Sequence, residues 1–315
     1  MVEIVRKLRR PPILTSSSIP CLQRLPTINI TEGCTLGCSY CYIQGYSHYP
    51  GPERVVLFEN TAEVVRDELR RKRKRPRRVY FSPSSDAFQY PPEVQEVTFQ
   101  TMSVLLEAGI EIAFLTKGFI SDRFLQRFSG VPQLVFAQVG VTSLDHGIWK
   151  TFEPRTAPPS KRVGSIRSLR ELGIETTARL DPLIPDLTDT EANLHPLLAA
   201  LRKAGVTRAY ASFLFLRQCF ADRVSAQLDE FMPVGSAAAW RHQDFIDGCG
   251  GGRMATLEDR AVRFERLSAL CDQHGIRLNA CRCKNPELGG SGCFIAGPTP
   301  IPADSSAPQS LFECR

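Results

Sequence analysis

A strand-like segment, Thr27-Ile-Asn-Ile-Thr31, leads directly into a loop with three closely spaced cysteines, Cys34-Thr-Leu-Gly-Cys38-Ser-Tyr-Cys41. Five further apolar, β-branched segments follow at residues 78–82, 110–116, 134–141, 174–180 and 206–212. Such segments are typical of strands, and helical patterns separate them. Because strands that alternate with helices pair in parallel, the sequence predicts an α/β fold, a partial (β/α)6 TIM-like barrel.

The expected helices have recognisable ends. Asn60-Thr-Ala-Glu63 and Thr188-Asp-Thr-Glu191 have the spacing of capping boxes, which begin helices. Pro91-Pro92 suits the first turn of a third helix, and Ser121 is expected to cap a short fourth one. Each of these expected helices therefore lies between two of the expected strands.

Composition and rhythm divide the chain into four parts. Residues 1–24 are an N-terminal extension, and residues 25–215 form the barrel. Residues 216–296 form a C-terminal, cysteine-containing extension, with a helix expected over 256–275. Residues 297–315 are rich in Pro, Ser and Ala, which predicts a disordered tail.

Composition also limits where the protein works. The 315 residues are 43% hydrophobic, enough for a sizeable core. The sequence contains no run of 18 apolar residues, which a membrane span would need. The N-terminus lacks the apolar stretch of a secretory signal. We therefore expect a cytoplasmic protein with no membrane partner.

The positive charge is local. The formal net charge is +6, and residues 70–78 alone hold eight Lys and Arg residues. This basic run ends a helix and precedes a strand, which puts it at the amino-terminal rim of the barrel. No aromatic residues that could stack on bases lie within it, so we interpret it as a solvated surface.

The cysteine loop is the strongest chemical signal. Eleven cysteines in a chain with no secretory signal favour metal binding over disulfides, and Cys34, Cys38 and Cys41 lie within eight residues. Three thiolates can hold one [4Fe–4S] cubane whose fourth iron has no protein ligand. A zinc site completed by His48 or a distant cysteine is the alternative.

The C-x-x-x-C-x-x-C spacing, with Tyr40 before the last cysteine, resembles the signature of the radical S-adenosylmethionine (radical SAM) superfamily over about residues 25–215. The resemblance implies a [4Fe–4S] cluster on the loop and S-adenosylmethionine (SAM) on its open iron. It implies reductive cleavage of SAM to a 5′-deoxyadenosyl radical that abstracts hydrogen from an organic substrate. It also implies an electron donor such as flavodoxin or ferredoxin, and it puts Tyr40 at the adenine-stacking position.

Several strand ends resemble the spore photoproduct lyase-like, or DNA repair photolyase-like, branch. The similar segments are Cys38-Ser-Tyr-Cys-Tyr42, Ser82-Pro-Ser-Ser-Asp86, Leu115-Thr-Lys-Gly118, Val141-Thr-Ser-Leu-Asp145, Glu153-Pro-Arg155 and Arg179-Leu-Asp-Pro-Leu-Ile-Pro185. The resemblance implies that a serine-rich stretch meets the SAM amino group, through Ser82, Ser84, Ser85 and Asp86. It implies that Lys117 or Arg179 meets the carboxylate or ribose.

The same branch suggests repair of a DNA lesion by a lyase. Spore photoproduct lyases use a cysteine near the end of the second strand as hydrogen donor. This chain has no cysteine between Cys41 and Cys219, which argues against that route. Nucleic acid, peptide and small molecule all stay open as substrates.

A second cysteine group follows a strand expected at residues 276–279. We interpret Cys281, Cys283 and Cys293 as ligands of an auxiliary [4Fe–4S] cluster, with structural zinc or three reduced cysteines as alternatives. Candidates for a fourth ligand are Cys249, Cys271 and Cys314.

A hypothesis of a different class is a zinc-stabilised nucleic-acid-binding protein that uses the basic run. It predicts colourless protein, salt-dependent DNA binding and no SAM turnover. The five histidines, at 48, 146, 195, 242 and 274, form no ligand-spaced pair in the sequence.

Overall fold

Seven parallel strands form the centre of the molecule. The computed structural model describes residues 2–17, 22, 25–236, 241–243, 252–281 and 284–288. Its main sheet has the order β14-β10-β9-β8-β7-β6-β3-β2, in which only β2 runs antiparallel to its neighbour. The strands are β2 (Thr15–Ser16), β3 (Pro26–Ile28), β6 (Arg78–Phe81), β7 (Glu111–Thr116), β8 (Val135–Gly140), β9 (Glu175–Leu183), β10 (Arg208–Phe213) and β14 (Arg277–Ala280).

The six predicted barrel strands are β3, β6, β7, β8, β9 and β10, and they pair in parallel in chain order. The sheet is open, so the predicted partial barrel is confirmed. The C-terminal extension adds β14 beside β10 as a further parallel strand. The first predicted strand, residues 27–31, is split. β3 ends at Ile28, and β4 (Thr31–Glu32) leaves the main sheet.

Two small sheets flank the main one, and the sequence patterns did not predict them. In the first, β5 (Arg54–Phe58) pairs in parallel with β1 (Glu3–Lys7) and antiparallel with β4. In the second, β13 (Gly252–Met254) pairs antiparallel with β11 (Leu216–Arg217) and β12 (Arg241–Gln243). The helix α7 (Gln218–Leu228) packs beside the second sheet.

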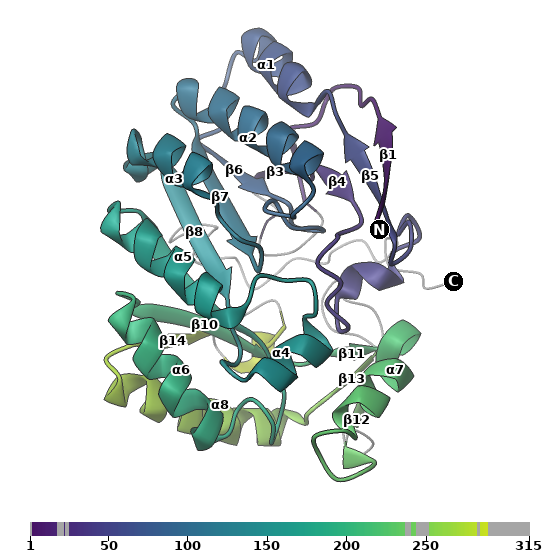
Figure 1. Ribbon diagram of the computed structural model, residues 1–315, viewed down its shortest axis with the longest axis vertical. Helices are drawn as coiled ribbons and strands as arrows, with labels where there is room; N and C mark the ends of the chain where they lie inside the picture. The colour runs from purple at the N-terminus through teal and green to yellow at the C-terminus, as the bar shows by residue number, and fades with distance from the viewer. Residues whose placement is uncertain are drawn as a thin grey trace.

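Most of the helices cover one face of the main sheet (Figure 1). They are α1 (Thr61–Arg71), α2 (Pro92–Glu107), α3 (Asp122–Ser129), α5 (Pro159–Glu171), α6 (Glu191–Lys203) and α8 (Leu257–Gln273). The short helix α4 (His146–Phe152) follows β8 and packs in a separate cluster with Ile184 and Phe220. Alternation along the strands decides which side chains face them. Val79 and Phe81 of β6 join the helix-side core, whereas Tyr80 belongs to a separate cluster on the other face.

The two predicted capping boxes are wrong in detail. The helix α1 begins after Asn60, as expected, but the Asn60 side chain makes no cap. It exchanges two hydrogen bonds with the backbone of Arg9 instead, at 2.9 and 3.0 Å. The cap of α6 is Thr190, while the Thr188 hydroxyl accepts a hydrogen bond from the backbone N–H of Ile184 at 2.7 Å. Both side chains therefore make other hydrogen bonds: that of Asn60 with distant Arg9, and that of Thr188 with the nearby backbone of Ile184.

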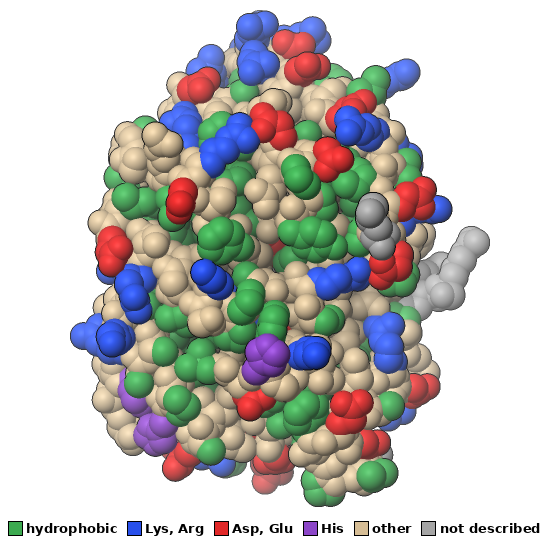
Figure 2. Space-filling model, in the orientation of Figure 1, with side chains coloured by type: hydrophobic (Ala, Val, Ile, Leu, Met, Phe, Trp, Pro, Cys, Tyr) green, Lys and Arg blue, Asp and Glu red, His purple; other side chains and the backbone are tan. Residues whose placement is uncertain are grey.

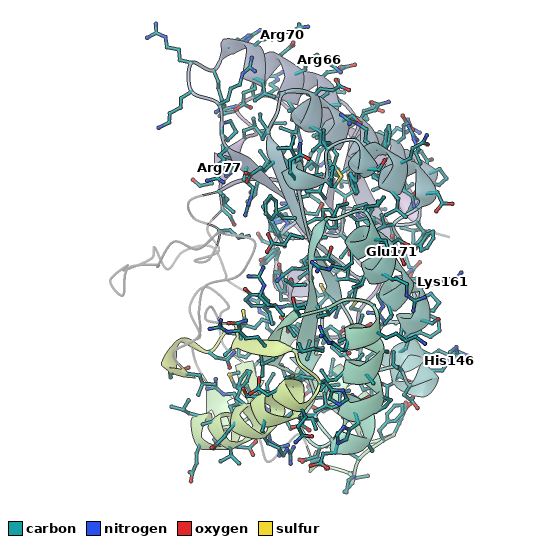
Figure 3. All side chains as sticks on the ribbon, turned by 90° about the vertical axis from the view of Figure 1, so that its left-hand side faces the viewer. Arg66, Arg70, Arg77, His146, Lys161 and Glu171 are labelled. Atoms are coloured by element: carbon teal, nitrogen blue, oxygen red, sulfur yellow. The ribbon has the colours of Figure 1, made fainter. Side chains whose placement is uncertain are left out.

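The basic run lies at the amino ends of the strands, because Arg78 opens β6. Figure 3 places Arg66, Arg70 and Arg77 at the end of the molecule farthest from His146, and Figure 2 shows Lys and Arg side chains over α1. Arg78 is tied down by Glu111 at 2.8 Å. The predicted tail, residues 297–315, lies outside the described residues. Within the part of the chain that is described, no helix is long and apolar enough to cross a membrane.

Candidate functional site

The cysteine loop lies at the carboxyl edge of the parallel strands, between β4 and a short 3-10 turn, η2 (Tyr42–Gly45), that Cys41 caps. The three thiols lie close enough together for the charges of Cys38 and Cys41 to act on Cys34. Burial raises the pKa of the Cys34 thiol well above its usual value, and the charges of Asp86, Cys41 and Cys38 raise it further. Burial also raises the pKa of the Cys41 thiol. Ligand binding would therefore have to stabilise the thiolate forms.

The donor set fits a cluster better than a single ion. Among the described residues, no three His, Cys, Asp or Glu side chains converge closely enough to ligate one ion. Thiolates on a cubane bind different irons, so they stand farther apart than ligands that share an ion. The loop supplies three thiols within eight residues, which suits a cubane with one iron left for another ligand.

A buried glutamine holds the start of the loop. Gln89 accepts a hydrogen bond from the backbone N–H of Thr35 at 2.7 Å and donates to the Thr31 hydroxyl at 2.8 Å. Gly37 adopts a positive φ of 64°, and a Cβ there would lie 2.7 Å from Nε of Arg155. The positive φ favours glycine here, and a side chain at this position would also have to displace the Arg155 guanidinium.

The end of β6 carries the serine-rich stretch. The Ser82 backbone is strained, with φ of 54°, and its N–H donates to the Ile28 carbonyl at 2.7 Å. The hydroxyls of Ser82 and Ser85 are buried and have no hydrogen-bond partner among the residues that the structure describes. Buried hydroxyls normally have one. These two oxygens are therefore available for a ligand at the carboxyl edge.

Asp86 is used differently from its serine neighbours. Its carboxylate accepts hydrogen bonds from the backbone N–H groups of Phe88 and Lys117, each at 2.8 Å, and from the Thr116 hydroxyl at 2.7 Å. Burial raises the pKa of this carboxyl, although these donors oppose the rise. Asp86 thus fastens the end of β7 to the serine stretch.

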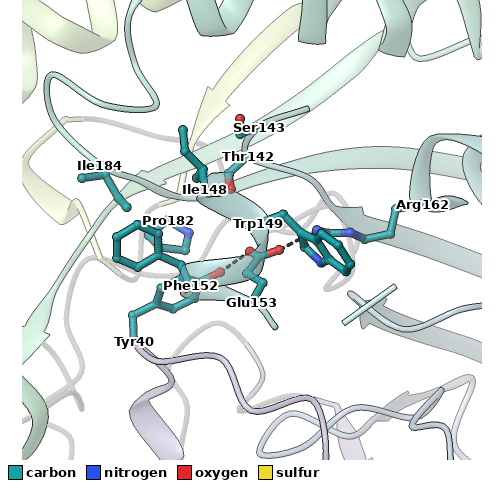
Figure 4. Close-up of a pocket in the computed structure, with 10 residues that line it drawn as sticks. All are labelled: Tyr40, Thr142, Ser143, Ile148, Trp149, Phe152, Glu153, Arg162, Pro182 and Ile184. Atoms are coloured by element: carbon teal, nitrogen blue, oxygen red, sulfur yellow. Dashed lines mark hydrogen bonds and ion pairs between the residues drawn. The ribbon is translucent and has the colours of Figure 1, made fainter. Parts of the chain in front are cut away.

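Tyr40 joins a buried charge network (Figure 4). Its hydroxyl donates to Glu153 and accepts from Lys117 Nζ at 2.6 Å. Glu153 also pairs with Lys117 at 2.9 Å and with Arg162 at 2.6 Å. Burial opposes ionisation of Glu153, but Arg162 and Lys117 overcome it and hold its pKa at about 2. The network anchors the cysteine loop, through Tyr40, to α4 and α5.

A second network reaches the site from the C-terminal extension. Asp181, near the end of β9, pairs with Arg179 at 2.7 Å and with Lys284 at 2.9 Å. Its backbone carbonyl accepts from Lys117 Nζ at 2.9 Å. Lys284 and Arg179 hold the pKa of Asp181 at about 2, against the effect of burial. The two networks therefore meet at Lys117.

The second cysteine group is only partly described. Cys281 is buried at the end of β14, where its N–H donates to the Ala211 carbonyl at 2.8 Å. It therefore lies at the same carboxyl edge as the first group. Cys283 and Cys293 lie outside the described residues, as do Cys249 and Cys314.

Comparison with known proteins identifies the family. A family model of the radical SAM superfamily matches residues 28–195, more than half of the chain. The chain belongs to the radical SAM superfamily. The match begins in β3, covers the cysteine loop and ends within α6.

Its relatives are distant. An uncharacterized protein of Mycobacterium tuberculosis is 29% identical over 213 residues, which make up 64% of this radical SAM chain and 63% of the relative. The chain thus matches less than two thirds of that relative's length. A protein of Pseudomonas phage M6 named radical SAM Nalpha-GlyT isomerase is 25% identical over 182 residues, covering 58% of this chain and 37% of its own length.

Solved structures share the fold. A mutant of spore photoproduct lyase, solved with bound AdoMet and dinucleoside spore photoproduct, has a TM-score of 0.65 at 14% identity, over 87% of this chain and 81% of its own. SuiB of Streptococcus suis, bound to S-adenosylmethionine, has a TM-score of 0.54 at 10% identity, over 81% of this chain and 49% of its own. At such identities the likeness concerns the fold of this radical SAM protein and not its substrate.

The structure brings most residues singled out in the sequence to one edge: the three cysteines, Tyr40, the stretch 82–86, Lys117 and Arg179. Sequence reasoning missed Gln89, Arg162, Asp181 and Lys284. Only the position of Lys284 beside the second cysteine group could have pointed to it. The structure brings one pair of histidines together from distant parts of the sequence, since His195 Nδ1 on α6 lies 3.1 Å from His274 Nε2 at the end of α8.

Proposed function

We propose that this radical SAM protein binds a [4Fe–4S] cluster through Cys34, Cys38 and Cys41 and binds SAM at the open iron. When bound, the reduced cluster supplies the electron that cleaves the SAM sulfonium, giving a 5′-deoxyadenosyl radical that removes hydrogen from an organic substrate. A flavodoxin or ferredoxin is the proposed electron donor. The cytoplasm, where such donors act, is the proposed location of the enzyme.

One observation carries the proposal. The unpartnered hydroxyls of Ser82 and Ser85 lie at the same strand edge as the three thiols. An ammonium group donates three hydrogen bonds and needs acceptors, and buried hydroxyls without partners are well suited to it. Membership of the superfamily supports this assignment over a zinc-stabilised nucleic-acid-binding protein.

The chain's own residues have distinct roles in this proposal. Ser82, Ser84 and Ser85 accept hydrogen bonds from the SAM amino group. Asp86 holds the serine stretch and β7 together and adds negative charge beside it. Arg179, with Lys117 nearby, meets the carboxylate or ribose.

Tyr40 lies on the adenine side of the proposed SAM site, and its hydroxyl is held by Glu153 and Lys117. Because these groups are already held by the fold, SAM binding costs little reorganisation.

The experiment is anaerobic reconstitution with iron and sulfide, followed by dithionite, SAM and measurement of 5′-deoxyadenosine. We expect about four irons on the first site and nucleoside formation that Cys38→Ala abolishes. The control is Cys219→Ala, which removes an exposed cysteine of α7 and should leave formation intact. A colourless wild-type protein that yields no 5′-deoxyadenosine would refute the proposal and favour zinc.

We also propose a second metal centre on Cys281, Cys283 and Cys293, with an auxiliary [4Fe–4S] cluster preferred to zinc. The burial of Cys281 at the carboxyl edge supports it. Cys281→Ala should lower the iron content from about eight to about four per chain while the first cluster stays. An iron content near four per chain in the wild-type protein, with no change in Cys281→Ala, would argue against the second cluster.

A further inference from the structure

Lys284 joins the active-site edge from a remote part of the sequence. Its Nζ lies 2.9 Å from Oδ1 of Asp181, with 24% of the Lys284 side chain and 11% of the Asp181 side chain exposed. The Asp181 carbonyl accepts from Lys117, whose Nζ also contacts the Tyr40 hydroxyl. Since Tyr40 lies between Cys38 and Cys41, a continuous set of contacts connects Lys284 to the cysteine loop.

Lys284 and the loop lie at the same edge of the sheet. The Lys284 N–H donates to the Cys281 carbonyl at the end of β14 at 3.2 Å, and its side chain reaches Asp181, which Lys117 connects to Tyr40 of the loop. The Lys284 cation therefore stands among the groups that hold the loop. Because the Lys284 and Asp181 side chains are largely removed from water, salt screens the effect of their charges less than it screens surface charges.

The two networks together are not neutral. Four cations, Lys117, Arg162, Arg179 and Lys284, surround two carboxylates, Glu153 and Asp181. Asp86, which uncharged donors hold, adds a third carboxylate beside the loop. Four cations against three carboxylates still leave a surplus of positive charge beside the loop, and such a surplus favours whichever state of a bound group is more negative.

We propose that Lys284, balanced by Asp181, raises the reduction potential of the cluster on Cys34, Cys38 and Cys41. The inference rests on the proposed function. In the step concerned, the cluster gains one electron from dithionite or a flavodoxin, and no bond is made or broken. A fixed cation near the sulfurs stabilises the reduced, more negative cluster, whereas the Asp181 carboxylate has the opposite effect.

A purely structural role makes a different prediction. If Lys284 only fastens the C-terminal extension to β9, its loss should lower stability without changing the potential. Removal of either partner would then act in the same way. An electrostatic role requires that Lys284 and Asp181 variants shift the potential in opposite directions.

The test is a redox titration of the reconstituted full-length protein without SAM, which follows the electron paramagnetic resonance signal that Cys38→Ala removes, so that a reduced cluster on Cys281 is not counted. At the wild-type midpoint, Lys284→Gln should lower the ratio of reduced to oxidised cluster about tenfold, a shift of about 59 mV for one electron. Asp181→Asn should raise that ratio, and Lys284→Arg should stay near wild type. The matched control is Lys161→Gln, which removes an exposed lysine on α5 (Figure 3).

Equal potentials for wild type and Lys284→Gln, or shifts of the same sign for the Lys284 and Asp181 variants, would overturn this inference alone. If Lys284→Gln does not fold, the Asp181→Asn variant is the test. A ratio of reduced to oxidised cluster that is unchanged or lower in Asp181→Asn would then contradict the inference. Absence of a reduced-cluster signal in the wild-type protein would overturn the proposed function, and this inference with it.

Discussion

The Glu153 carboxylate and the Arg162 guanidinium form an ion pair of 2.6 Å, with 4% and 1% of their side chains exposed. Arg162 also donates to the Gly140 carbonyl at 2.7 Å, which ties α5 to the end of β8. On its other side Glu153 contacts Lys117 and Tyr40. One carboxylate therefore couples the helix layer, a strand end and the cysteine loop.

We first predict that Glu153→Ala is strongly destabilising. The change leaves Arg162 and Lys117 without their counter-charge, and breaking a buried pair costs about 3–5 kcal/mol. Urea denaturation of the apoprotein measures this loss. Glu171→Ala, an exposed change on α5, should stay within about 0.5 kcal/mol of wild type. A similarly small loss for Glu153→Ala would contradict the buried network.

The second prediction concerns acid. The pKa of Glu153 is lowered from 4.5 to about 2 in the folded protein. Its contribution to stability is therefore complete above about pH 4.5 and is lost as the pH falls towards 2. The shift corresponds to about 3 kcal/mol. Denaturation of the apoprotein at pH 5 and pH 3 should show about 2 kcal/mol of this loss, with a weaker pH dependence in Glu153→Gln; identical pH profiles would refute it.

A third prediction separates ligand binding from stability. Ser82→Ala and Ser85→Ala remove hydroxyls that have no partner within the described part of the chain, so neither should destabilise the apoprotein by more than about 1 kcal/mol. Each should weaken SAM binding to the reconstituted protein about tenfold, because a hydrogen bond to a charged group is lost. Calorimetric titration with SAM measures the effect. Ser165→Ala, a buried unpartnered hydroxyl on α5, is the matched control and should bind SAM normally.

Our fourth prediction concerns the loop backbone. Gly37→Ala puts a Cβ within 2.7 Å of Arg155 at a positive φ, at a cost of at least about 1–2 kcal/mol. We expect the loop to shift and the iron content after reconstitution to fall by more than half. Gly164→Ala on α5, with no atom within 4 Å of the new Cβ, should keep full iron content. Full incorporation in Gly37→Ala would show that the loop tolerates the side chain.

Local patterns predicted much of this protein. Strand-forming residues and helix boundaries repeat along the chain, so the six parallel strands could be predicted from neighbours in the sequence. The cysteine spacing in 34–41 is local as well. The short strands β1 and β5 were not predicted, although β5 is apolar over Val55–Phe58, because each lies outside the strand–helix repeat and is stabilised by a partner about 50 residues away.

Long-range contacts decided the rest of the site. Nothing near Glu153 in the sequence predicts Arg162 and Lys117 as joint partners, and nothing near Lys284 predicts Asp181. Asn60 was taken from its expected cap by Arg9. Sequence patterns determine which elements form and which ligands stand close along the chain. Charge pairing depends on which side chains burial brings together, and only the tertiary structure decides that.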